Sequence, residues 1–285
     1  MATTPMPRID VLKTYKLFIA GAFPRSESGR VYAVKGAKGE HLANPALASR
    51  KDLRDAVVAA RGAFAGWSSA TAYNRGQILY RMAEILEGRT EQLVSEITAL
   101  EGATVKAATS QVQESVDLLV WYAGWSDKIM SIAGSTNSVS GPYYNFSTPE
   151  PLGVVAIFSA AKPSLLNFVG ALAAVITSGN SAVIIASEKF PLPAITFSEI
   201  MATSDLPSGV VNVLTGSSTE LAPWAASHMD IDAIDASGLT AKQLKEAQIA
   251  GAANLKRIRT YSSAKSVHRI LNFMETKTVW HPIGI

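Results

Sequence analysis

Side chains able to perform chemistry are few in this sequence, and their spacing matches no familiar reactive site. The chain contains no cysteine, which excludes a thiol nucleophile, a thiolate metal site and a disulfide. Its histidines lack the paired spacing that binds zinc, and they stand singly as His41, His228, His268 and His281. The acidic stretch Asp230–Asp235 is interpreted as carboxylates that alternate outward along a strand. We therefore expect no metal site.

Composition narrows the class of protein. Of 285 residues, 48% are hydrophobic and 17% are charged, and the net charge is only +3. This balance is typical of a globular protein, and without a block of like charges we expect no nucleic-acid partner. No apolar run is long enough for a membrane span, and residues 1–13 hold no apolar signal core, so we expect a cytoplasmic protein without a membrane partner. Four aromatic residues are expected to pack rather than stack on bases, namely Trp67, Trp121, Tyr122 and Trp125.

The second half of the chain alternates apolar segments with helical patterns. Strands are predicted at Gly153–Ser159, Ser181–Ser187, Val210–Gly216, Ile231–Ser237 and Leu255–Ser263. Helices are predicted at Ser164–Thr177, Pro191–Ala202, Ser218–His228, Thr240–Ala252 and Ala264–Phe273. This alternation predicts an α/β fold with a Rossmann-like, doubly wound parallel sheet. No GxGxxG follows the first strand, so pattern alone favours glycines that cap strands and helices.

The first half of the chain is mainly helical. An edge hairpin is predicted at Lys16–Phe23, with Val31–Val34 as a candidate return strand. Helices are predicted at Lys51–Trp67, Asn74–Leu100 and Val105–Ile132. Gly141–Pro151 is aromatic and extended, and Leu271–Ile285 has the chemistry of a further strand. That last strand needs a sheet to join.

Several phrases together resemble the aldehyde dehydrogenase superfamily. Lys16–Arg30 is similar to its opening hairpin, Ala63–Leu86 to its Trp-containing helix pair, and Pro149–Ser159 to the lead-in of its cofactor domain. LPSGVVNVLTG, at Leu206–Gly216, is similar to a further family phrase. The resemblance runs from about Lys16 to the end of the chain. FPRSESGR and the ending KTVWHPIGI most resemble the family 16 branch, in which one module lacks the catalytic cysteine.

The resemblance implies a reaction whose parts can be sought here. Such enzymes attack an aldehyde with a cysteine thiolate, hold the oxyanion with an Asn amide and pass hydride to NAD(P). A Glu then activates the hydrolytic water. Lys162 stands where the family has the Asn, and Tyr261 stands where it has the Glu. We therefore predict no catalytic residues in this chain, with Lys162 and Tyr261 as degenerate positions.

The implied cofactor contacts are only partly preserved. Glu188 and Gly238 match positions that contact the ribose and the pyrophosphate, and they are the candidate cofactor-binding residues. Ile185 and Leu239 replace the family's Lys and Ser and are degenerate. A competing interpretation makes Glu188 a first-turn acid of the next helix. We expect no tightly bound cofactor, and NAD(P) is the candidate ligand.

The end of the chain implies a missing domain. Shortly after Lys265 the sequence passes to FMETKTVW, which resembles the extreme C-terminus of the family, so the resemblance implies that the catalytic domain is absent. It also implies that this strand joins Gly141–Pro151 in a small β oligomerisation arm. The expected interface residues are Tyr143, Tyr144, Phe146, Thr276, Thr278, Val279 and Trp280. The expected organisation is a hairpin, helices and arm in residues 1–150, a Rossmann-like domain in 151–270 and the C-terminal strand in 271–285.

Three functions follow from these observations. The favoured prediction is a non-catalytic subunit that assembles with an intact NAD(P)-dependent aldehyde dehydrogenase, or with itself, and stabilises or regulates its partner. An exposed face left by a missing domain and an arm strand that needs a sheet edge both favour it. The second is a module that senses NAD(P). The third, and least favoured, is an aldehyde oxidoreductase that uses Lys162 or Tyr261 in a new role.

Overall fold

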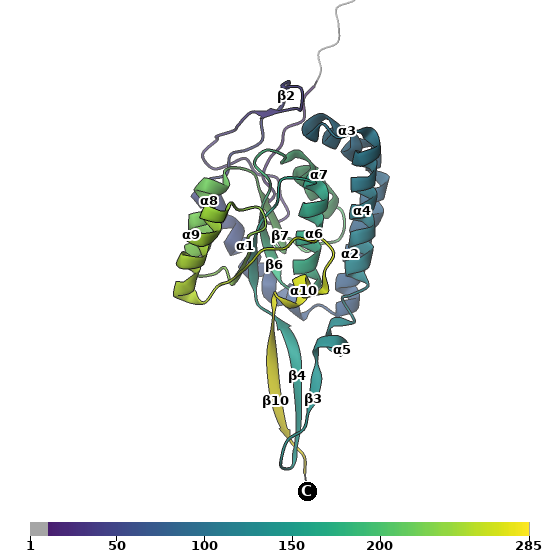
Figure 1. Ribbon diagram of the computed structural model, residues 1–285, viewed down its shortest axis with the longest axis vertical. Helices are drawn as coiled ribbons and strands as arrows, with labels where there is room; N and C mark the ends of the chain where they lie inside the picture. The colour runs from purple at the N-terminus through teal and green to yellow at the C-terminus, as the bar shows by residue number, and fades with distance from the viewer. Residues whose placement is uncertain (1–10, 285) are drawn as a thin grey trace, which may run out of the picture.

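A parallel sheet with helices on both faces forms the body of the protein, whose computed structural model describes residues 11–284 (Figure 1). The strands follow the order β7-β6-β5-β8-β9, and each neighbouring pair is parallel. Their bounds in that order are Val211–Leu214, Ser181–Ile185, Val154–Phe158, Ala233–Asp235 and Arg257–Arg259. The predicted α/β fold with a Rossmann-like, doubly wound sheet is confirmed.

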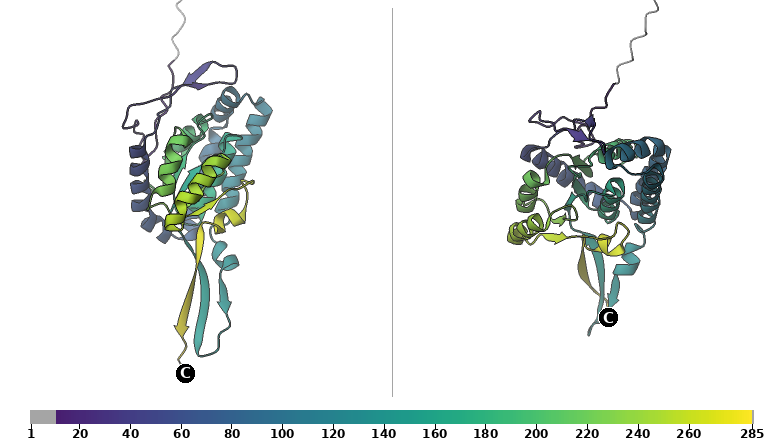
Figure 2. Two further views of the ribbon diagram at one scale, coloured as in Figure 1. Left: turned by 60° about the vertical axis from the view of Figure 1, so that its left-hand side comes forward. Right: turned by 45° about the horizontal axis from the view of Figure 1, so that its top comes forward.

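Alternating side chains of the strands build one core on each face of the sheet. In β5, Val154 and Ala156 pack with one set of helices, and Val155 and Ile157 pack with the other. The first set comprises α1 (Arg50–Ser69), α8 (Ser218–Ser227) and α9 (Ala241–Gly251). The second set, on the opposite face (Figure 2), includes α6 (Ser164–Thr177), α7 (Leu192–Met201), α2 (Ala72–Gly88) and α4 (Val105–Ala123).

Helix α6 is apolar around its whole circumference because it lies between the sheet and helices α2 and α4. Leu166 and Asn167 are its only partly exposed residues. Among the helices of residues 11–284, none is both long and apolar enough to cross a membrane.

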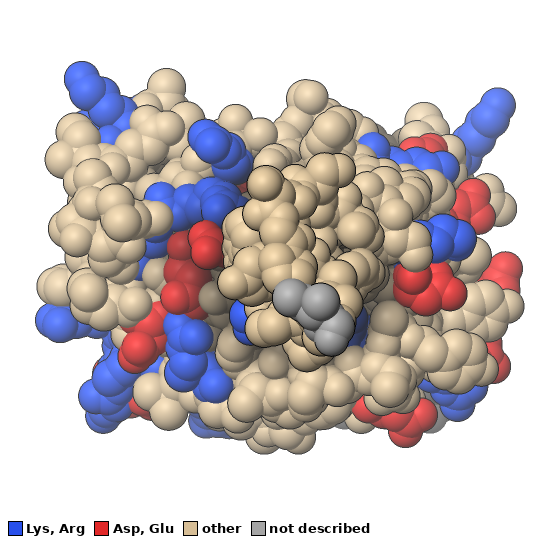
Figure 3. Space-filling model, turned by 90° about the horizontal axis from the view of Figure 1, so that it is seen from below, with Lys and Arg blue, Asp and Glu red and all other residues tan. Residues whose placement is uncertain are grey.

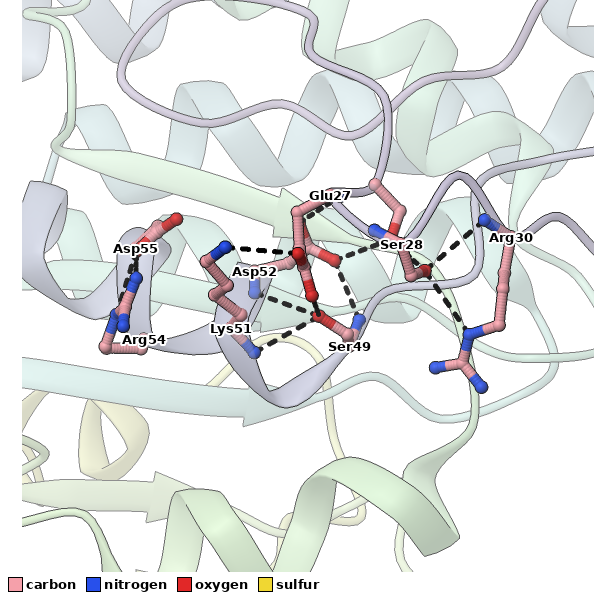
Figure 4. A network of polar contacts seen from close by, with 9 residues as sticks. Glu27, Ser28, Arg30, Ser49, Lys51, Asp52, Arg54 and Asp55 are labelled. Carbon is pink, nitrogen blue, oxygen red and sulfur yellow. Dashed lines mark hydrogen bonds and ion pairs between the residues drawn. The ribbon is translucent and has the colours of Figure 1, made fainter.

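Helix α1 begins where two side chains form a capping box. The Ser49 hydroxyl accepts the N–H groups of Lys51 and Asp52, and the Asp52 carboxylate accepts the N–H of Ser49 (Figure 4). Asp52 is buried, and it also accepts the Ser26 hydroxyl at 2.7 Å and the Glu27 N–H at 3.0 Å. One carboxylate therefore caps the helix and ties the N-terminal loop to it.

Two of the predicted helices are interrupted. Asn74–Leu100 forms α2 and α3 (Thr90–Glu101), because Gly88 is a poor helix former and Arg89 pairs with Glu199 at 3.0 Å. The pattern at Val105–Ile132 likewise splits into α4, capped at Gly124, and α5 (Ile129–Ala133). The apolar period continues across both interruptions because all four segments pack on one core, so periodicity alone does not reveal the breaks.

The first segments also pair differently from the prediction. Lys16–Phe23 makes a tight turn, but Phe18 pairs with β7, so this segment extends the edge of the parallel sheet. Val31–Val34 is not its return strand, because β1 (Val34–Lys35) pairs with β2 (His41–Ala43). Helix α10 (Val267–Leu271) is shorter than the predicted Ala264–Phe273.

An arm of three antiparallel strands projects from the body (Figures 1 and 2). Its strands, in spatial order, are β10 (Met274–Pro282), β4 (Tyr143–Pro151) and β3 (Ser135–Asn137). Every residue of β10 pairs with β4. The C-terminal strand therefore belongs to the predicted small sheet. The division at residues 150 and 270 stays a prediction, and its outer ends, residues 1–10 and Ile285, lie outside the described residues.

A buried lysine predicts a specific pH dependence of stability. Lys256 is 8% exposed and donates to the carbonyl oxygens of His228 and Ile231 at 2.5 and 2.6 Å. Burial lowers the pKa of Lys256 to about 8. The unfolded chain keeps this proton to higher pH than the folded chain. The lysine therefore raises the free energy of unfolding, by at most about 3 kcal/mol, as the pH rises from about 8 to about 10.

Urea unfolding of the wild type and Lys256→Met at pH 7.5 and 9.5 checks this. In Lys256→Met the free energy of unfolding should not rise between these two pH values. The comparison also separates the lysine from Tyr122 and Tyr261, whose pKa values burial raises to about 12 and which lower stability above about pH 10. An equal pH dependence in both proteins would contradict the assignment.

Candidate functional site

The direction of the chain across the sheet reverses between β5 and β8. The chain adds β6 and β7 on one side of β5 and then crosses to β8 and β9 on the other. In open parallel sheets, ligands bind outside the carboxyl ends of the strands at such a switch point. The candidate site therefore lies at Phe158–Ser159, after β5, and at Asp235–Gly238, after β8.

Gly238 brings these two strand ends into backbone contact. Its N–H donates to the carbonyl oxygen of Phe158 at 2.8 Å. A Cβ at this position would lie 2.6 Å from that oxygen and closer still to the carbonyl oxygen of Ser159. Leu239 packs against the core shared by α1, α8 and α9. Gly238 thus has a packing role and its N–H is engaged, while its contact with a cofactor stays a prediction.

Substitution of Gly238 tests the packing role. Gly238→Ala should lower the free energy of unfolding by about 1–3 kcal/mol, because the methyl group must displace backbone atoms. The matched control is Gly62→Ala in α1, where a Cβ would meet nothing within 4 Å and alanine favours the helix. Urea unfolding of the two variants measures the difference, and equal stabilities would refute the role.

Lys162 and the start of α6 are engaged with the neighbouring helices. The Lys162 ammonium donates to the carbonyl oxygen of Glu101 at 2.7 Å. The N–H of Ser164 donates to the Glu101 carboxylate at 2.9 Å, and the N–H of Leu165 donates to the Gln111 side chain at 2.9 Å. Free N–H groups at a helix start are the ones that hold anions. At α6 these two are already satisfied within the chain.

The two positions after β6 differ in exposure. Ile185 ends β6 and is buried, whereas Glu188 is exposed in the following turn. Helix α7 begins only at Leu192, so the interpretation of Glu188 as its first-turn acid is wrong. Burial and, secondarily, the charge of Glu188 raise the pKa of Tyr32. Contact of Glu188 with a cofactor stays a prediction.

A buried ion pair at this edge was not predicted from the sequence. Asp235 is fully buried, and the Arg269 side chain from α10 is 5% exposed. Nη2 and Nε of Arg269 lie 2.6 and 3.1 Å from Oδ2 of Asp235. The other carboxylate oxygen accepts the hydroxyl and the N–H of Ser237 at 2.6 and 3.1 Å.

The interpretation of Asp230–Asp235 as outward-facing acids is therefore wrong at its last residue. Asp230 is exposed, and Asp232 is partly buried and pairs with Arg61 at 2.6 Å, but both residues precede β8 rather than lie in it. Asp235 faces the interior instead. The position of Asp235 within an apolar strand could have predicted the ion pair. A carboxylate buried there needs a cationic partner.

Tyr261 packs against this ion pair. Its ring centroid lies 4.8 Å from the Arg269 guanidinium and 5.9 Å from the Phe273 ring. Its N–H donates to the Ser237 hydroxyl at 3.0 Å. Burial raises the pKa of Tyr261 to about 12, so the phenol is neutral near pH 7 and is a poor general base.

The other chemistry-bearing residues do not gather into a site. Within residues 11–284, His, Asp and Glu side chains form no group of three that would hold a metal ion. Trp67 and Tyr122 are buried, and they donate to the carbonyl oxygens of Ile176 and Ala264 at 3.0 and 2.7 Å. Trp121 and Trp125 pack against the same core from its margin.

Both faces of the arm expose aromatic side chains. The rings of Tyr143 and Trp280 lie 5.8 Å apart on one face, and those of Tyr144 and Phe146 lie 5.5 Å apart on the other. Trp280 is 58% exposed. Seen from below, the surface at the arm consists mostly of residues other than Lys, Arg, Asp and Glu, drawn in tan (Figure 3). The charged residues lie mainly at the periphery of this view. A three-stranded sheet with two open faces has no core of its own.

Strand β10 is also an open edge. It is the outer strand of the arm, with β4 as its only partner among residues 11–284. Thr276 and Thr278 are exposed, and Val279 is partly buried on the opposite face. The Thr278 and Ser147 hydroxyls lie 2.9 Å apart and link β10 to β4. The predicted interface residues thus all lie on the arm, divided between its two faces, while their contact with a partner stays a prediction.

Comparison with known proteins assigns the family. The model of the family described as "Aldehyde dehydrogenase family" matches residues 23–281. The chain belongs to the aldehyde dehydrogenase family. It is 34% identical to retinal dehydrogenase 2 of Mus musculus over 271 residues, which cover 92% of this chain and 51% of that protein. It is 31% identical to omega-crystallin of Enteroctopus dofleini over 270 residues, 93% of this chain and 54% of that protein.

Solved aldehyde dehydrogenase structures share the fold. A putative aldehyde dehydrogenase from Burkholderia cenocepacia matches with a TM-score of 0.83 and 27% identity, over 87% of this chain and 50% of that chain. The NAD+ complex of an aldehyde dehydrogenase from Bacillus cereus matches with a TM-score of 0.81 and 26% identity, with the same coverage. This aldehyde dehydrogenase family member thus spans about half the length of the curated relatives it matches.

The residues at the carboxyl edge do not fit the cofactor that the family implies. The N–H groups of Gly238, Ser164 and Leu165 all donate to acceptors within the chain. The cavity between Ser159, Ser237, Tyr261 and Arg269 has a volume of about 30 Å³. That is room for a water molecule, whereas small-molecule sites usually enclose about 300–1,000 Å³. The space between these four residues is therefore too small for a dinucleotide.

Proposed function

We propose that this chain is a non-catalytic aldehyde dehydrogenase-like subunit. It assembles through its arm with an intact NAD(P)-dependent aldehyde dehydrogenase, which it stabilises or regulates. The observation that carries the proposal is an arm with two open aromatic faces on a chain that contains no cysteine. Because the family's reaction begins with a thiolate attack, residues 1–285 by themselves hold no group that could start it.

The two substituted positions support a non-catalytic role. The Lys162 ammonium is hydrogen-bonded to the carbonyl oxygen of Glu101 rather than free to hold an oxyanion. Tyr261 holds its proton, since burial raises its pKa to about 12. An aldehyde oxidoreductase would need a nucleophile, an oxyanion donor and a base, and the described residues supply none of the three in position. The closed carboxyl edge likewise weighs against an NAD(P) sensor.

The arm supports assembly with a partner. An exposed group of aromatic side chains on a sheet without a core usually marks a protein–protein interface. The edge of β10 has free backbone groups that a strand of another chain would satisfy. A full-length dehydrogenase is the partner we favour because it supplies the missing thiol, and a second copy of this chain is the alternative.

Native mass spectrometry of the protein purified from its source tests the proposal. The expected mass is that of this chain together with a larger, cysteine-containing aldehyde dehydrogenase. A homogeneous monomer or homodimer would refute it. Trp280→Ala on the arm should weaken the complex, whereas Tyr80→Ala on α2, with a similar exposure of 57% against 58%, should not.

An activity measurement tests the non-catalytic part separately. The isolated chain, given an aldehyde and NAD+, should form no NADH. NADH formation that Lys162→Ala abolishes would show an active enzyme, whatever the state of assembly.

A further inference from the structure

We infer that the carboxyl edge of the parallel sheet serves as the anchor of the C-terminal arm strand. In this arrangement the Arg269–Asp235 ion pair latches α10 across the place where a dinucleotide would bind. Nucleotide binding and attachment of the arm therefore exclude each other. The latch lies within one chain, so its test succeeds or fails whether or not the proposed partner exists.

The first element of the latch is the ion pair itself. Asp235 is the last residue of β8, at the switch point, and it is fully buried. Both Arg269 contacts go to one of its oxygens, and Ser237 satisfies the other. A buried pair of this kind is costly to break, because the remaining charge would be left without a partner in the interior. Arg269 therefore holds α10 firmly on this edge.

The second element is the segment between β9 and α10, residues 260–266, which closes the crevice. The Ser237 hydroxyl accepts the Tyr261 N–H, and the carbonyl oxygen of Ala264 accepts the Tyr122 hydroxyl at 2.7 Å. The contact with α6 is so close that a Cβ at Gly170 would lie 2.8 Å from the Cβ of Ala264. This segment leaves the cavity of about 30 Å³. A nucleotide can enter only if the segment and Arg269 leave.

The third element connects α10 to the arm. Figure 1 shows α10 where β10 leaves the body. The carbonyl oxygen of Phe273, between the two elements, accepts the Leu152 N–H at 3.2 Å and the Asn180 side chain at 2.7 Å. The Arg257 guanidinium donates to the carbonyl oxygens of Asn272 and Met274 at 2.9 and 2.7 Å. Only Asn272 and Phe273 join α10 to β10, so displacement of α10 would pull on these bonds and on the first residues of β10.

A nucleotide titration of the wild-type chain tests the exclusion. NADH fluorescence and calorimetry should show no saturable binding up to about 1 mM, which corresponds to a very weak interaction. A dissociation constant below about 1 mM would overturn the inference. This experiment needs no variant and is independent of any partner.

Hydrogen exchange of two variants tests the attachment. Arg269→Met keeps the length of the side chain but removes the charge, and it should speed amide exchange in residues 267–276 at least about tenfold. The control is Arg61→Met, which breaks a pair of the same 2.6 Å length to Asp232, the residue just before β8, without touching α10. It should change exchange in residues 267–276 less than about twofold.

Asp235→Asn is a second test of the attachment, for use if Arg269→Met does not fold. It keeps an oxygen for Ser237, and it should speed exchange in the same residues. Equal exchange in wild type and Asp235→Asn, or equal effects of Arg269→Met and Arg61→Met, would overturn the inference.

Discussion

Truncation after Phe273 is expected to abolish assembly while the parallel sheet stays folded. It removes β10 and with it Trp280 and the open edge of the arm. The chain end keeps the Phe273 carbonyl, which accepts Asn180 and Leu152, so the core loses none of these bonds. The complex should dissociate at least about a hundredfold more readily, or about 2.7 kcal/mol. Light scattering measures assembly, and circular dichroism measures folding.

The matched control for the truncation is Lys277→Ala. It removes only an exposed ion pair with Glu150, whose atoms lie 3.1 Å apart, and such pairs contribute little. Lys277→Ala should assemble like the wild type. A truncated chain that also assembles normally would remove the arm from the proposed interface.

Substitution of Arg269, which removes the latch, is expected to lower the free energy of unfolding more than any of the other single substitutions. Arg269→Met leaves the Asp235 carboxylate buried without its cation, which should lower the free energy of unfolding by about 3–5 kcal/mol. The double variant Arg269→Met, Asp235→Leu leaves no buried charge, and it should recover at least about half of that loss.

Urea unfolding of the wild type, Arg269→Met, Asp235→Leu and the double variant completes the double-mutant cycle. Arg61→Met is again the control, because its pair with Asp232 is about one-third exposed and should contribute no more than about 1 kcal/mol. A loss of similar size for Arg269→Met and Arg61→Met would mean that burial does not strengthen this pair.

Most of the secondary structure could be predicted because its signals are local. The strands of the parallel sheet are continuous apolar runs, since both of their faces are buried, and each is followed by one helical pattern. The helix breaks at Arg89 and Gly124 escaped prediction because the apolar period continues through them. The partner of Phe18 escaped because strand pairing at a sheet edge depends on residues nearly 200 positions away.

The sequence was enough to predict which of the family's functional residues are replaced at the candidate site. It did not predict which contacts the replacing residues make. The types of Lys162 and Tyr261 were enough to predict that two parts of the family's reaction are missing. Nothing in their neighbourhood indicated that Glu101 would occupy both the Lys162 ammonium and the start of α6. Gly238 looked like a phosphate contact, but its N–H is used between two strand ends.

Residue types by themselves determined that this chain has no thiol chemistry, because a nucleophile that is absent from the composition cannot be restored by folding. They also determined the α/β alternation, which depends on neighbours in the chain. Only the tertiary structure decided what occupies the carboxyl edge of the sheet. Asp235 and Arg269 are 34 positions apart, and β10 meets β4 from the other end of the chain's second half. Such contacts depend on which strand end and which helix are adjacent in the folded chain. A local sequence pattern does not specify that adjacency.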